Sequence, residues 1–350
     1  MSPRRDVLGP DDAVERPVVS PVAAAEDERD DASLRPKTLD EFVGQPELVE
    51  HLRIVLEAAK LRGQVVDHLL FAGPPGLGKT SLAGIVATEL GVGLRVTSGP
   101  VLGRPGDLAS LLTDLTDGDV LFIDEIHRLP RAVEEVLYPA MEDGKVDIVI
   151  GKGPSARSIR LELPSFTLAG ATTRIGLVAS PLRDRFGFVG RVDLYDPVDL
   201  EAIVERSASL LSVRIETGGA RAIAERSRGT PRIANRLLRR VRDFVEVRGS
   251  GVITEATANE GLEVFGIDEL GLDKVDRMIL DVLCMRFAGH PVGLSTLSQS
   301  VGEEPGTIED AYEPFLVQSG LVMRTPRGRV GTQRAFKHLG LGPPSLLGGR

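Results

Sequence analysis

The stretch Gly73-Pro-Pro-Gly-Leu-Gly-Lys-Thr80 fits the pattern G-x-x-x-x-G-K-[ST], and it decides the fold class of the chain. Gly76 and Gly78 let backbone N–H groups turn inward around phosphate oxygens, and a helix that follows adds the positive end of its dipole. Lys79 can reach the β- and γ-phosphates of a nucleotide, and Thr80 can ligate Mg²⁺. The stretch therefore predicts a P-loop that binds ATP together with Mg²⁺.

The residues on either side of this loop predict the strand and the helix that a P-loop requires. A buried strand is expected over residues 68–73 and a helix over residues 81–90, with Ser81 as a further nucleotide contact. Two more short apolar strands are expected, over residues 120–123 and 167–172. Apolar strands that alternate with helices indicate a parallel α/β sheet, so one large domain is expected over residues 33–191.

The strand over residues 120–123 ends in two carboxylates, Asp124 and Glu125. In an open α/β sheet, ligands bind at the carboxyl ends of the strands, which is where this pair lies. Asp124 would hold Mg²⁺, and Glu125 would orient or deprotonate the water that attacks the nucleotide. Alone, the pair is also compatible with an ordinary solvated strand end, but beside a P-loop it indicates ATP hydrolysis. Kinases, small GTPases and ring ATPases share both motifs, so the function must come from the rest of the chain.

Beyond residue 191 the hydrophobic pattern changes twice. Residues 192–265 show only helical periodicity and predict a small all-α domain, with helices over residues 201–211, 219–227 and 232–247. Residues 266–340 predict three further helices, near residues 274–287, 295–301 and 308–318. A hairpin with its turn at Pro326-Arg-Gly328 follows them, and three helices with such a wing indicate a winged helix.

The formal charge of −9 is spread unevenly along the chain. Residues 1–31 hold nine acidic and four basic residues with almost no large apolar side chain, so residues 1–32 are expected to form a disordered acidic tail. Residues 321–350 hold six basic residues and no acidic one, and residues 341–350 are expected to be a flexible tail. This local asymmetry bears on partners more than the total charge does.

Composition also indicates the compartment. Cys284 is the only cysteine, which excludes an internal disulfide framework and favours a reducing environment. No apolar run approaches the roughly 18 residues that span a bilayer, and the N-terminus leads into acidic sequence instead of an apolar signal segment. We therefore expect a cytoplasmic protein that is not embedded in a membrane.

Several stretches that follow the P-loop in fixed order resemble the motifs of AAA+ ATPases. They are Asp124-Glu-Ile-His127 (Walker B), Gly170-Ala-Thr-Thr-Arg174 (sensor 1), Ser180-Pro-Leu-Arg-Asp-Arg-Phe-Gly187 (arginine finger) and Gly229-Thr-Pro-Arg-Ile-Ala-Asn235 (sensor 2). The sequences of these stretches are similar to those of the RuvB family, and the resemblance extends over about residues 34–339 without a large gap. It implies a homo-hexameric AAA+ motor, with a helical lid and a winged helix, that drives branch migration of Holliday junctions.

The resemblance assigns roles to residues around the nucleotide. Thr173 would hydrogen-bond the attacking water or the γ-phosphate, and Arg185 would reach into the neighbouring subunit's site. Such fingers are worth roughly 10³–10⁵ in rate. Arg232 would touch the γ-phosphate in its own subunit and couple nucleotide state to the angle between domains. Without the resemblance, the pattern around Arg185 favours a surface charge on a loop, and the run of arginines around Arg232 favours a solvated helix face.

The resemblance also implies an adenosine pocket. Leu34, Arg35 and Tyr195 would line it, although Tyr195 alone is also compatible with a half-buried core position. The backbone of residues 142–144 would lie nearby, namely Glu142, Asp143 and Gly144. Gly144 is a departure, since the family usually has an aromatic residue there.

Residues 145–163 predict a β-hairpin with an apolar face. Val146, Ile148 and Ile150 stand at alternate positions, a turn follows at Gly151-Lys-Gly-Pro-Ser155, and the alternation resumes with Ile159, Leu161 and Leu163. In the RuvB family an inserted hairpin here docks onto RuvA, the junction-binding partner. A plain edge hairpin of the core sheet is the alternative.

The C-terminal segment predicts how duplex DNA is held. The third helix of the winged unit carries Glu309, Asp310 and Glu313, which phosphates would repel, whereas the wing is basic. We expect the wing to contact the phosphate backbone without base readout, which suits a motor that moves over any sequence. The resemblance implies that Arg324 and Arg329 contact the DNA. It also implies that this DNA is duplex DNA at four-way junctions, and that a RuvC-like resolvase is a further partner.

Two other classes of function remain open at this point. A clamp-loader-like or initiator-like ATPase would share the motifs, but the hairpin and the basic wing argue against it. A non-enzymatic DNA-binding regulator with a vestigial nucleotide fold is opposed by the intact Lys79, Thr80, Asp124, Glu125 and Arg185.

Overall fold

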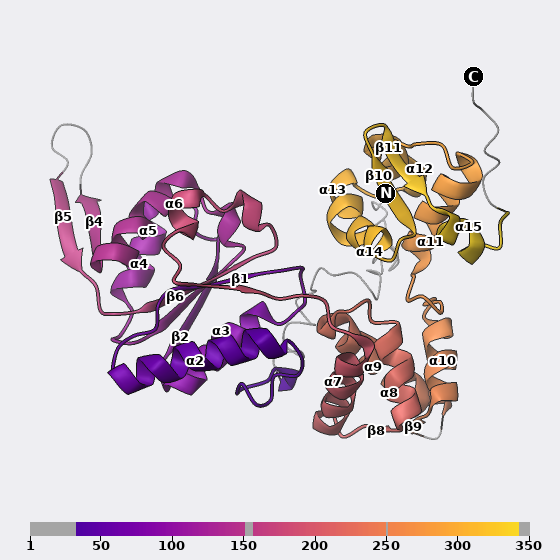
Figure 1. Cartoon of the computed structure of the whole chain (residues 1–350), viewed down its shortest axis with the longest axis horizontal. Helices are drawn as coiled ribbons and strands as arrows, with labels where there is room; N and C mark the ends of the chain where they lie inside the picture. The colour runs from indigo at the N-terminus through magenta and orange to yellow at the C-terminus, as the bar shows by residue number, and fades with distance from the viewer. Residues whose placement is uncertain (1–32, 151–156, 250, 343–350) are drawn as a thin grey trace, which may run out of the picture. The chain divides into compact units, whose positions relative to one another are not determined.

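The computed structural model describes residues 33–150, 157–249 and 251–342 (Figure 1). The chain divides into two compact units, one within residues 23–261 and the other within residues 262–350. The predicted acidic tail (residues 1–32), the tip of the predicted hairpin (residues 151–156) and most of the predicted C-terminal tail lie outside the described residues.

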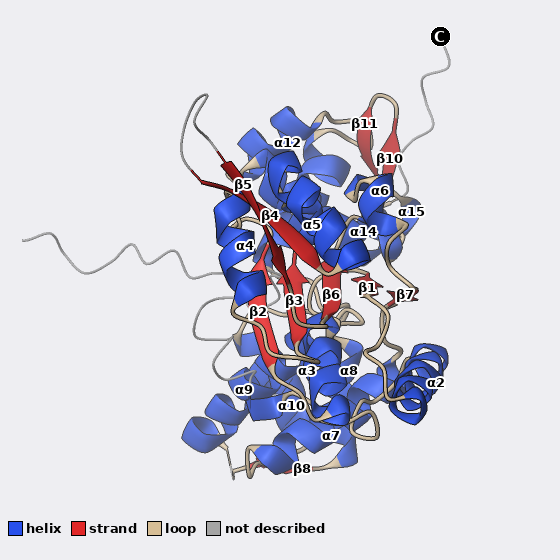
Figure 2. Cartoon of the chain, turned by 90° about the vertical axis from the view of Figure 1, so that its left-hand side faces the viewer, coloured by secondary structure: helices blue, strands red, loops and turns tan. Residues whose placement is uncertain are grey.

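The first unit contains a five-stranded parallel sheet in the order β2-β3-β6-β1-β7 (Figure 2). The strands are β1 (Leu69–Ala72), β2 (Leu94–Ser98), β3 (Val120–Asp124), β6 (Thr167–Thr172) and β7 (Phe188–Arg191). All three central strands were predicted, because burial on both faces gives them continuous apolar runs. The edge strands β2 and β7 were not predicted, because they are largely exposed and carry mixed residues.

Helices cover both faces of this sheet. Figure 1 shows α2 (Pro46–Arg62) and α3 (Lys79–Leu90) on one face, and α4 (Pro105–Thr113) and α5 (Arg131–Asp143) on the other. The short α6 (Ser180–Arg183) precedes β7. Buried leucines of α4 and α5, such as Leu108 and Leu137, pack with Leu121 and Ile123 of β3. The carboxyl end of β3 is therefore held by a dry core on one side, which fixes where Asp124 and Glu125 emerge.

The predicted hairpin is present and is separate from the core sheet. β4 (Lys145–Ile150) and β5 (Arg157–Glu162) form an antiparallel two-stranded sheet of their own, with Val146 opposite Leu161. The alternative of a plain edge hairpin of the core sheet is therefore wrong within the described residues. Val146 is buried, whereas Ile159 and Leu161 are 45% and 37% exposed, so the apolar face is only partly covered.

The helical part of the first unit follows β7. Its helices are α7 (Pro197–Leu210), α8 (Thr217–Glu225), α9 (Pro231–Arg248) and α10 (Glu255–Val264), the last of which crosses the boundary between the units. The prediction of a purely helical segment is wrong in one detail, since β8 (Arg214–Ile215) and β9 (Val252–Ile253) form a parallel pair. Strands of two residues are too short for a periodic pattern to reveal.

The second unit is the predicted winged helix. Its elements are α11 (Lys274–Asp281), η4 (Val282–Arg286), α12 (Leu294–Val301), α13 (Pro305–Thr307), η5 (Ile308–Tyr312), α14 (Glu313–Gln318), β10 (Val322–Thr325), β11 (Gly328–Gly331) and α15 (Gln333–His338). Residues such as Leu280, Ile308, Leu316 and Phe336 form one buried core. β10 and β11 pair with Thr325 opposite Gly328, so the wing turns at the predicted place.

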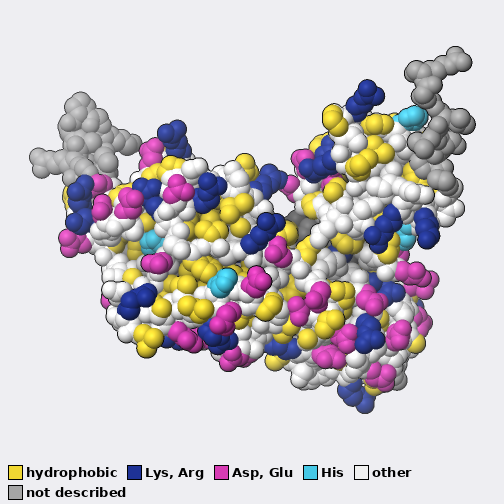
Figure 3. Space-filling view, in the orientation of Figure 1, with side chains coloured by type: hydrophobic (Ala, Val, Ile, Leu, Met, Phe, Trp, Pro, Cys, Tyr) yellow, Lys and Arg dark blue, Asp and Glu magenta, His cyan; other side chains and the backbone are white. Residues whose placement is uncertain are grey.

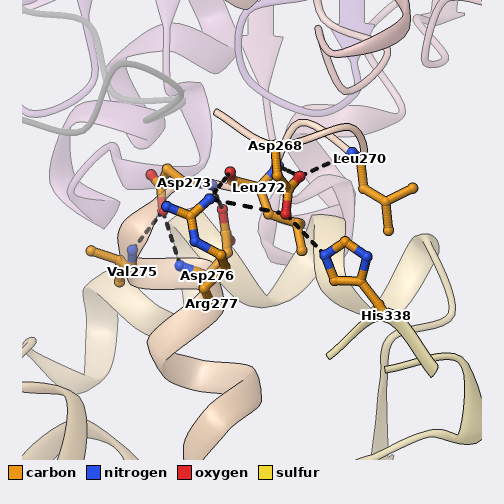
Figure 4. A network of polar contacts seen from close by, with 8 residues as sticks. All are labelled: Asp268, Leu270, Leu272, Asp273, Val275, Asp276, Arg277 and His338. Carbon is orange, nitrogen blue, oxygen red and sulfur yellow. Dashed lines mark hydrogen bonds and ion pairs between the residues drawn. The ribbon is translucent and has the colours of Figure 1, made fainter. Parts of the chain in front are cut away.

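A polar network joins the beginning of this unit to its end (Figure 4). Asp273 caps α11 by accepting hydrogen bonds from the backbone N–H groups of Val275 and Asp276, and the Asp276 carboxylate accepts from the Asp273 N–H. Asp268 accepts from the Leu272 N–H and lies 2.9 Å from Nε2 of His338. The contact between His338 and Asp268 ties α15 to the segment that precedes α11, and α15 in turn packs on the wing strand β11.

Candidate functional site

The P-loop connects β1 to α3 and has the backbone that its glycines allow. Gly73, Gly76 and Gly78 have φ angles of 158°, 79° and 97°. A Cβ atom on Gly73 would lie 2.1 Å from the carbonyl oxygen of Val192, so no other residue fits there. Lys79 is 7% exposed, and its Nζ donates to the carbonyl oxygens of Gly73 and Pro74 at 2.8 and 2.7 Å. The loop therefore curls around the lysine that the sequence predicts to bind phosphate.

Burial lowers the pKa of Lys79 to about 8, although the nearby Asp124 carboxylate opposes the shift and Arg232 adds to it. We expect ADP, in the presence of EDTA, to bind more weakly as the pH rises from about 7 to about 9. A bound polyphosphate favours the charged form of the Lys79 ammonium. When the pH lies above the pKa that Lys79 has in the nucleotide-free protein, Lys79 must therefore take up a proton as ADP binds. Titration calorimetry in buffers of different ionisation enthalpy measures that uptake.

The matched control for this pH dependence is Lys79→Arg, because a guanidinium stays charged throughout this range. The control is expected to bind ADP without proton uptake linked to position 79. Wild-type affinity that stays constant over the same pH range, with no uptake, would show that the lysine is not the titrating phosphate ligand.

The two Walker B carboxylates lie at the end of β3. The backbone N–H of Glu125 donates to Asp124 Oδ1 at 2.8 Å, and Asp124 acts electrostatically on Lys79 across the sheet edge. Glu125 itself has a left-handed backbone (φ 48°), which is costly for a residue with a side chain and is typical of functional turns. Its carboxylate forms an exposed ion pair with Arg128 at 2.9 Å.

Thr173 follows β6, the strand next to β3, and it is exposed at the sheet edge. Its neighbour Thr172 is buried, and its hydroxyl accepts from the Arg174 N–H and lies 3.0 Å from Nδ1 of His127. The P-loop also joins here, because the Gly73 N–H donates to the carbonyl of Thr172. This link between the Walker B turn and sensor 1 was not predicted from the sequence, where the only signal for it is the histidine in Asp124-Glu-Ile-His127.

Arg232 lies beside the P-loop of its own chain. Its backbone N–H donates to the carbonyl of Gly76 at 3.3 Å, and a Cβ on Gly76 would lie 3.1 Å from the Cβ of Arg232. It is the second residue of α9, and Pro231 begins that helix. The structure therefore brings sensor 2 and the P-loop together.

Of the residues expected to line the adenosine pocket, Tyr195 contacts the P-loop. Tyr195 is buried, and its hydroxyl donates to the carbonyl of Leu77 at 3.3 Å. Leu34 is also buried, and its carbonyl accepts from Arg206 of α7, while Arg35 is half-buried beside it. The segment that contains Leu34 and Arg35 is thus fastened to the helical part, which Tyr195 precedes.

Glu142, Asp143 and Gly144 do not join this pocket. They end α5 beside Met141, whose carbonyl accepts a hydrogen bond from Nε2 of His68. His68 precedes β1, whereas the P-loop follows it. Glu142, Asp143 and Gly144 therefore lie at the amino ends of the parallel strands, and the P-loop lies at their carboxyl ends. The expectation that they flank the adenosine pocket of their own chain is therefore corrected, and the reason is the direction in which α5 runs along the sheet.

Arg185 also lies at the amino ends of the parallel strands. It comes three residues before β7, and Phe188 of β7 pairs in parallel with Leu69, the first residue of β1. Its guanidinium is 2.8 Å from Glu142 Oε1, hydrogen-bonds the carbonyl of Pro181 and stacks 4.7 Å from the ring centroid of Tyr138. Arg185 and Glu142 therefore form one cluster that is separated from the chain's own P-loop by the length of the strands.

Acidic and basic side chains are interspersed on the visible surface of both units (Figure 3). Contacts to DNA therefore have to be argued from particular residues. Arg324 and Arg329 of the wing both bond Glu313, and their side chains are 52% and 15% exposed. The two arginines that the sequence treats alike thus differ in their access to solvent.

The donor set beside the P-loop fits a magnesium ion that also binds phosphate. Mg²⁺ is commonly held by one or two carboxylates together with substrate phosphates, and Thr80 and Asp124 supply a hydroxyl and a carboxylate. Groups of three or more His, Cys, Asp or Glu side chains that could hold a metal are absent from the described residues. No helix within those residues combines the length and apolar character that a membrane crossing requires.

Three family models match the chain in succession. They are the P-loop domain of the Holliday junction DNA helicase RuvB (residues 34–192), the RuvB AAA lid domain (residues 195–268) and the RuvB C-terminal winged helix domain (residues 269–340). They correspond to the order of folds that the sequence predicted.

Similar proteins point the same way. A Holliday junction branch migration complex subunit RuvB from Rubrobacter xylanophilus is 59% identical over 96% of this chain and 94% of its own length. The subunit of the same name from Nocardia farcinica is 60% identical over 94% of this chain and 92% of its own length. The solved Thermotoga maritima RuvB Holliday junction branch migration motor has a TM-score of 0.80 at 51% identity, over 89% of this chain and all of that one. This chain therefore belongs to the RuvB family.

Proposed function

We propose that this chain is the ATP-hydrolysing motor that drives branch migration of Holliday junctions. It acts in the cytoplasm as a homo-hexameric ring around duplex DNA, with a RuvA-like protein that holds the junction and a RuvC-like resolvase as a further partner. The observation that carries the ring proposal is the position of Arg185, at the sheet edge opposite the chain's own P-loop.

The position of Arg185 supports a finger that acts between subunits. The four residues of β1 alone advance roughly 13 Å along the sheet, and the P-loop begins only after them. The side chain of Arg185 is too short to cross that distance. A second copy that presents its Arg185 edge to the P-loop of the first completes the site, and this head-to-tail contact generates a ring.

Within one site, the chain's own residues position ATP and water. Lys79 binds the β- and γ-phosphates, Thr80 and Asp124 hold Mg²⁺, and Glu125 orients or deprotonates the attacking water. When bound there, Mg²⁺ would supply positive charge against the charge that develops on the phosphates. Thr173 hydrogen-bonds the water or the γ-phosphate, and Ser81 with the P-loop glycines Gly76 and Gly78 adds contacts around the phosphates. For Glu125 to reach the water it must leave its exposed pair with Arg128, which is worth little energetically.

The nucleotide is held between the two halves of the first unit. Leu34, Arg35 and Tyr195 line the adenosine, and Arg232 contacts the γ-phosphate at the start of α9. Because Arg232 belongs to the helical part and Gly76 to the P-loop, loss of the γ-phosphate changes how the two halves fit together. Glu142, Asp143 and Gly144 act from the neighbouring subunit, together with Arg185.

Two further surfaces serve the DNA junction. The hairpin β4–β5 carries the partly exposed Ile159 and Leu161, and this apolar face docks onto the RuvA-like partner. The wing contacts the DNA backbone through Arg324, and Arg329 lies behind it. Contacts to phosphate without base readout let the motor pass over any sequence.

The test is ATP-dependent dissociation of a labelled synthetic four-way junction, with and without the cognate RuvA-like protein. We expect the wild-type protein to convert the junction into duplex arms and the partner to stimulate the reaction. Glu125→Gln, which binds nucleotide without hydrolysing it, is the matched control. ATP hydrolysis without any movement of the junction would favour a clamp-loader-like ATPase instead, and no hydrolysis at all would favour a vestigial nucleotide fold.

A further inference from the structure

The wing has two different faces. β10 and β11 pair Arg324 directly with Arg329 and Met323 directly with Val330. Because side chains alternate along a strand, both arginines share one face, and Met323 lies on the other, where it is 53% exposed. The arginine face is turned toward the acidic residues of η5 and α14, since both arginines bond them.

Glu313 lies at the centre of these contacts. Its side chain is only 3% exposed, and one oxygen accepts from Nε of Arg324 at 2.6 Å and from Nε of Arg329 at 3.0 Å. The other oxygen accepts from Nη2 of Arg329 at 3.0 Å. Burial raises the pKa of Glu313, but the hydrogen bonds from Arg329 and Arg324 outweigh burial, so its pKa stays below the ordinary value. Glu313 is therefore an ionised, buried acceptor for two guanidinium groups.

The two arginines use this acceptor differently. Arg329 gives both Nε and Nη2 to Glu313, also contacts Glu309 at 3.4 Å, and is 15% exposed. Arg324 gives only its Nε, and Nη2 lies 3.8 Å from Glu309, beyond hydrogen-bonding distance. Because Nε donates to Glu313 and Nη2 lies on the side of Glu309, the N–H groups of Nη1 are the ones directed away from the carboxylates. Arg324 is half exposed and can bind phosphate in this orientation.

We propose that Glu313 is a positioning residue for DNA binding, which orients the guanidinium of Arg324 toward the phosphate backbone while Arg329 braces the pair from behind. The proposal rests on the proposed contact between the wing and DNA. A guanidinium that is already oriented loses less side-chain entropy when it binds phosphate. This role explains why carboxylates, which repel phosphate, occupy the helix beside the wing.

The sign of one substitution separates this role from a purely electrostatic one. If Glu313 acted only as a negative charge near DNA, its removal would strengthen binding, as removal of any repelling charge does. If it positions Arg324, its removal weakens binding even though the surface becomes more basic. Glu309 offers the matched control, because it is 44% exposed, lies on the same helical segment and makes only the longer contacts.

The experiment measures duplex binding by the full chain, using fluorescence anisotropy over a series of salt concentrations. We expect Glu309→Gln to bind as tightly as the wild type or more tightly. We expect Glu313→Gln to weaken duplex binding by about twofold to tenfold. This factor corresponds to the entropy cost of immobilising one side chain. The slope of log affinity against log salt should stay at the wild-type value, because Arg324 keeps its charge in this variant, whereas Arg324→Ala should lower the slope by about one unit. Tighter binding by Glu313→Gln would overturn the proposal.

Two further variants keep the test decisive if Glu313→Gln perturbs the wing. Arg324→Lys retains the charge but has no Nε to be fixed, so it should weaken binding without altering wing folding; wild-type affinity would overturn the proposal. Glu313→Gln added to Arg324→Ala should cause no further loss, and an additive loss would contradict positioning. Arg324→Ala alone tests the underlying function, because unchanged affinity and slope there would remove the wing as a DNA contact altogether.

Discussion

Arg185→Ala and Glu125→Gln are each expected to abolish nearly all ATP hydrolysis, and a mixture of the two variants is expected to regain part of it. Loss of the finger removes roughly 10³–10⁵ of the rate, and loss of Glu125 removes the group that prepares the water. In a mixed ring, a subunit with intact Glu125 can receive an intact Arg185 from its neighbour. Random assembly completes roughly a quarter of the sites, since both halves must come from the right variant.

The measurement is steady-state phosphate release by the two variants alone and mixed in equal amounts, with co-assembly verified by differently sized tags. Arg183→Ala is a matched control, because Arg183 ends α6 two residues before Arg185 and should leave hydrolysis near the wild-type rate. If verified mixed rings never exceed the single variants, the finger does not act between subunits.

Arg329→Ala is expected to destabilise the winged-helix unit, whereas Arg324→Ala is expected mainly to weaken DNA binding. The side chain of Glu313 is only 3% exposed. Removing Arg329 deprives its carboxylate of the bidentate hydrogen bonds from Nε and Nη2 of that arginine. Breaking a buried pair in this way costs about 3–5 kcal/mol, a large fraction of the stability of a small domain. Arg324 is half exposed, so its loss removes a phosphate contact and one hydrogen bond while the buried pair remains.

Hydrogen exchange of the amides of β10 and β11 in the full chain measures this difference. Arg329→Ala should speed exchange by about a hundredfold or more, and Arg324→Ala should leave it within a few-fold of the wild type. The double variant Arg329→Met with Glu313→Leu is expected to recover much of the stability, since apolar residues can replace a buried ion pair. Equal protection in Arg329→Ala and the wild type would show that Glu313 does not depend on Arg329.

The central strands and the phosphate loop could be predicted from the sequence because their chemistry is local. β1, β3 and β6 are apolar throughout because both of their faces are buried, and a P-loop needs its glycines and its lysine within eight consecutive residues. β2 and β7 escaped prediction because edge strands are not constrained on both faces. α15 escaped as well, since its six residues are too few for a clear helical pattern.

The sequence by itself determined the fold class and the family, and it predicted which residues bind and hydrolyse ATP, because spacing along the chain carries that information. Only the tertiary structure decided which residues meet. It placed Arg232 on the P-loop of its own chain and put Arg185 with Glu142 at the opposite edge of the sheet. It likewise made the two arginines of the wing differ, since Arg324 is an exposed partner of Glu313 and Arg329 is a half-buried one. The physical reason is that the direction of a parallel strand and the face of a hairpin are set by packing against distant residues, which no local pattern encodes.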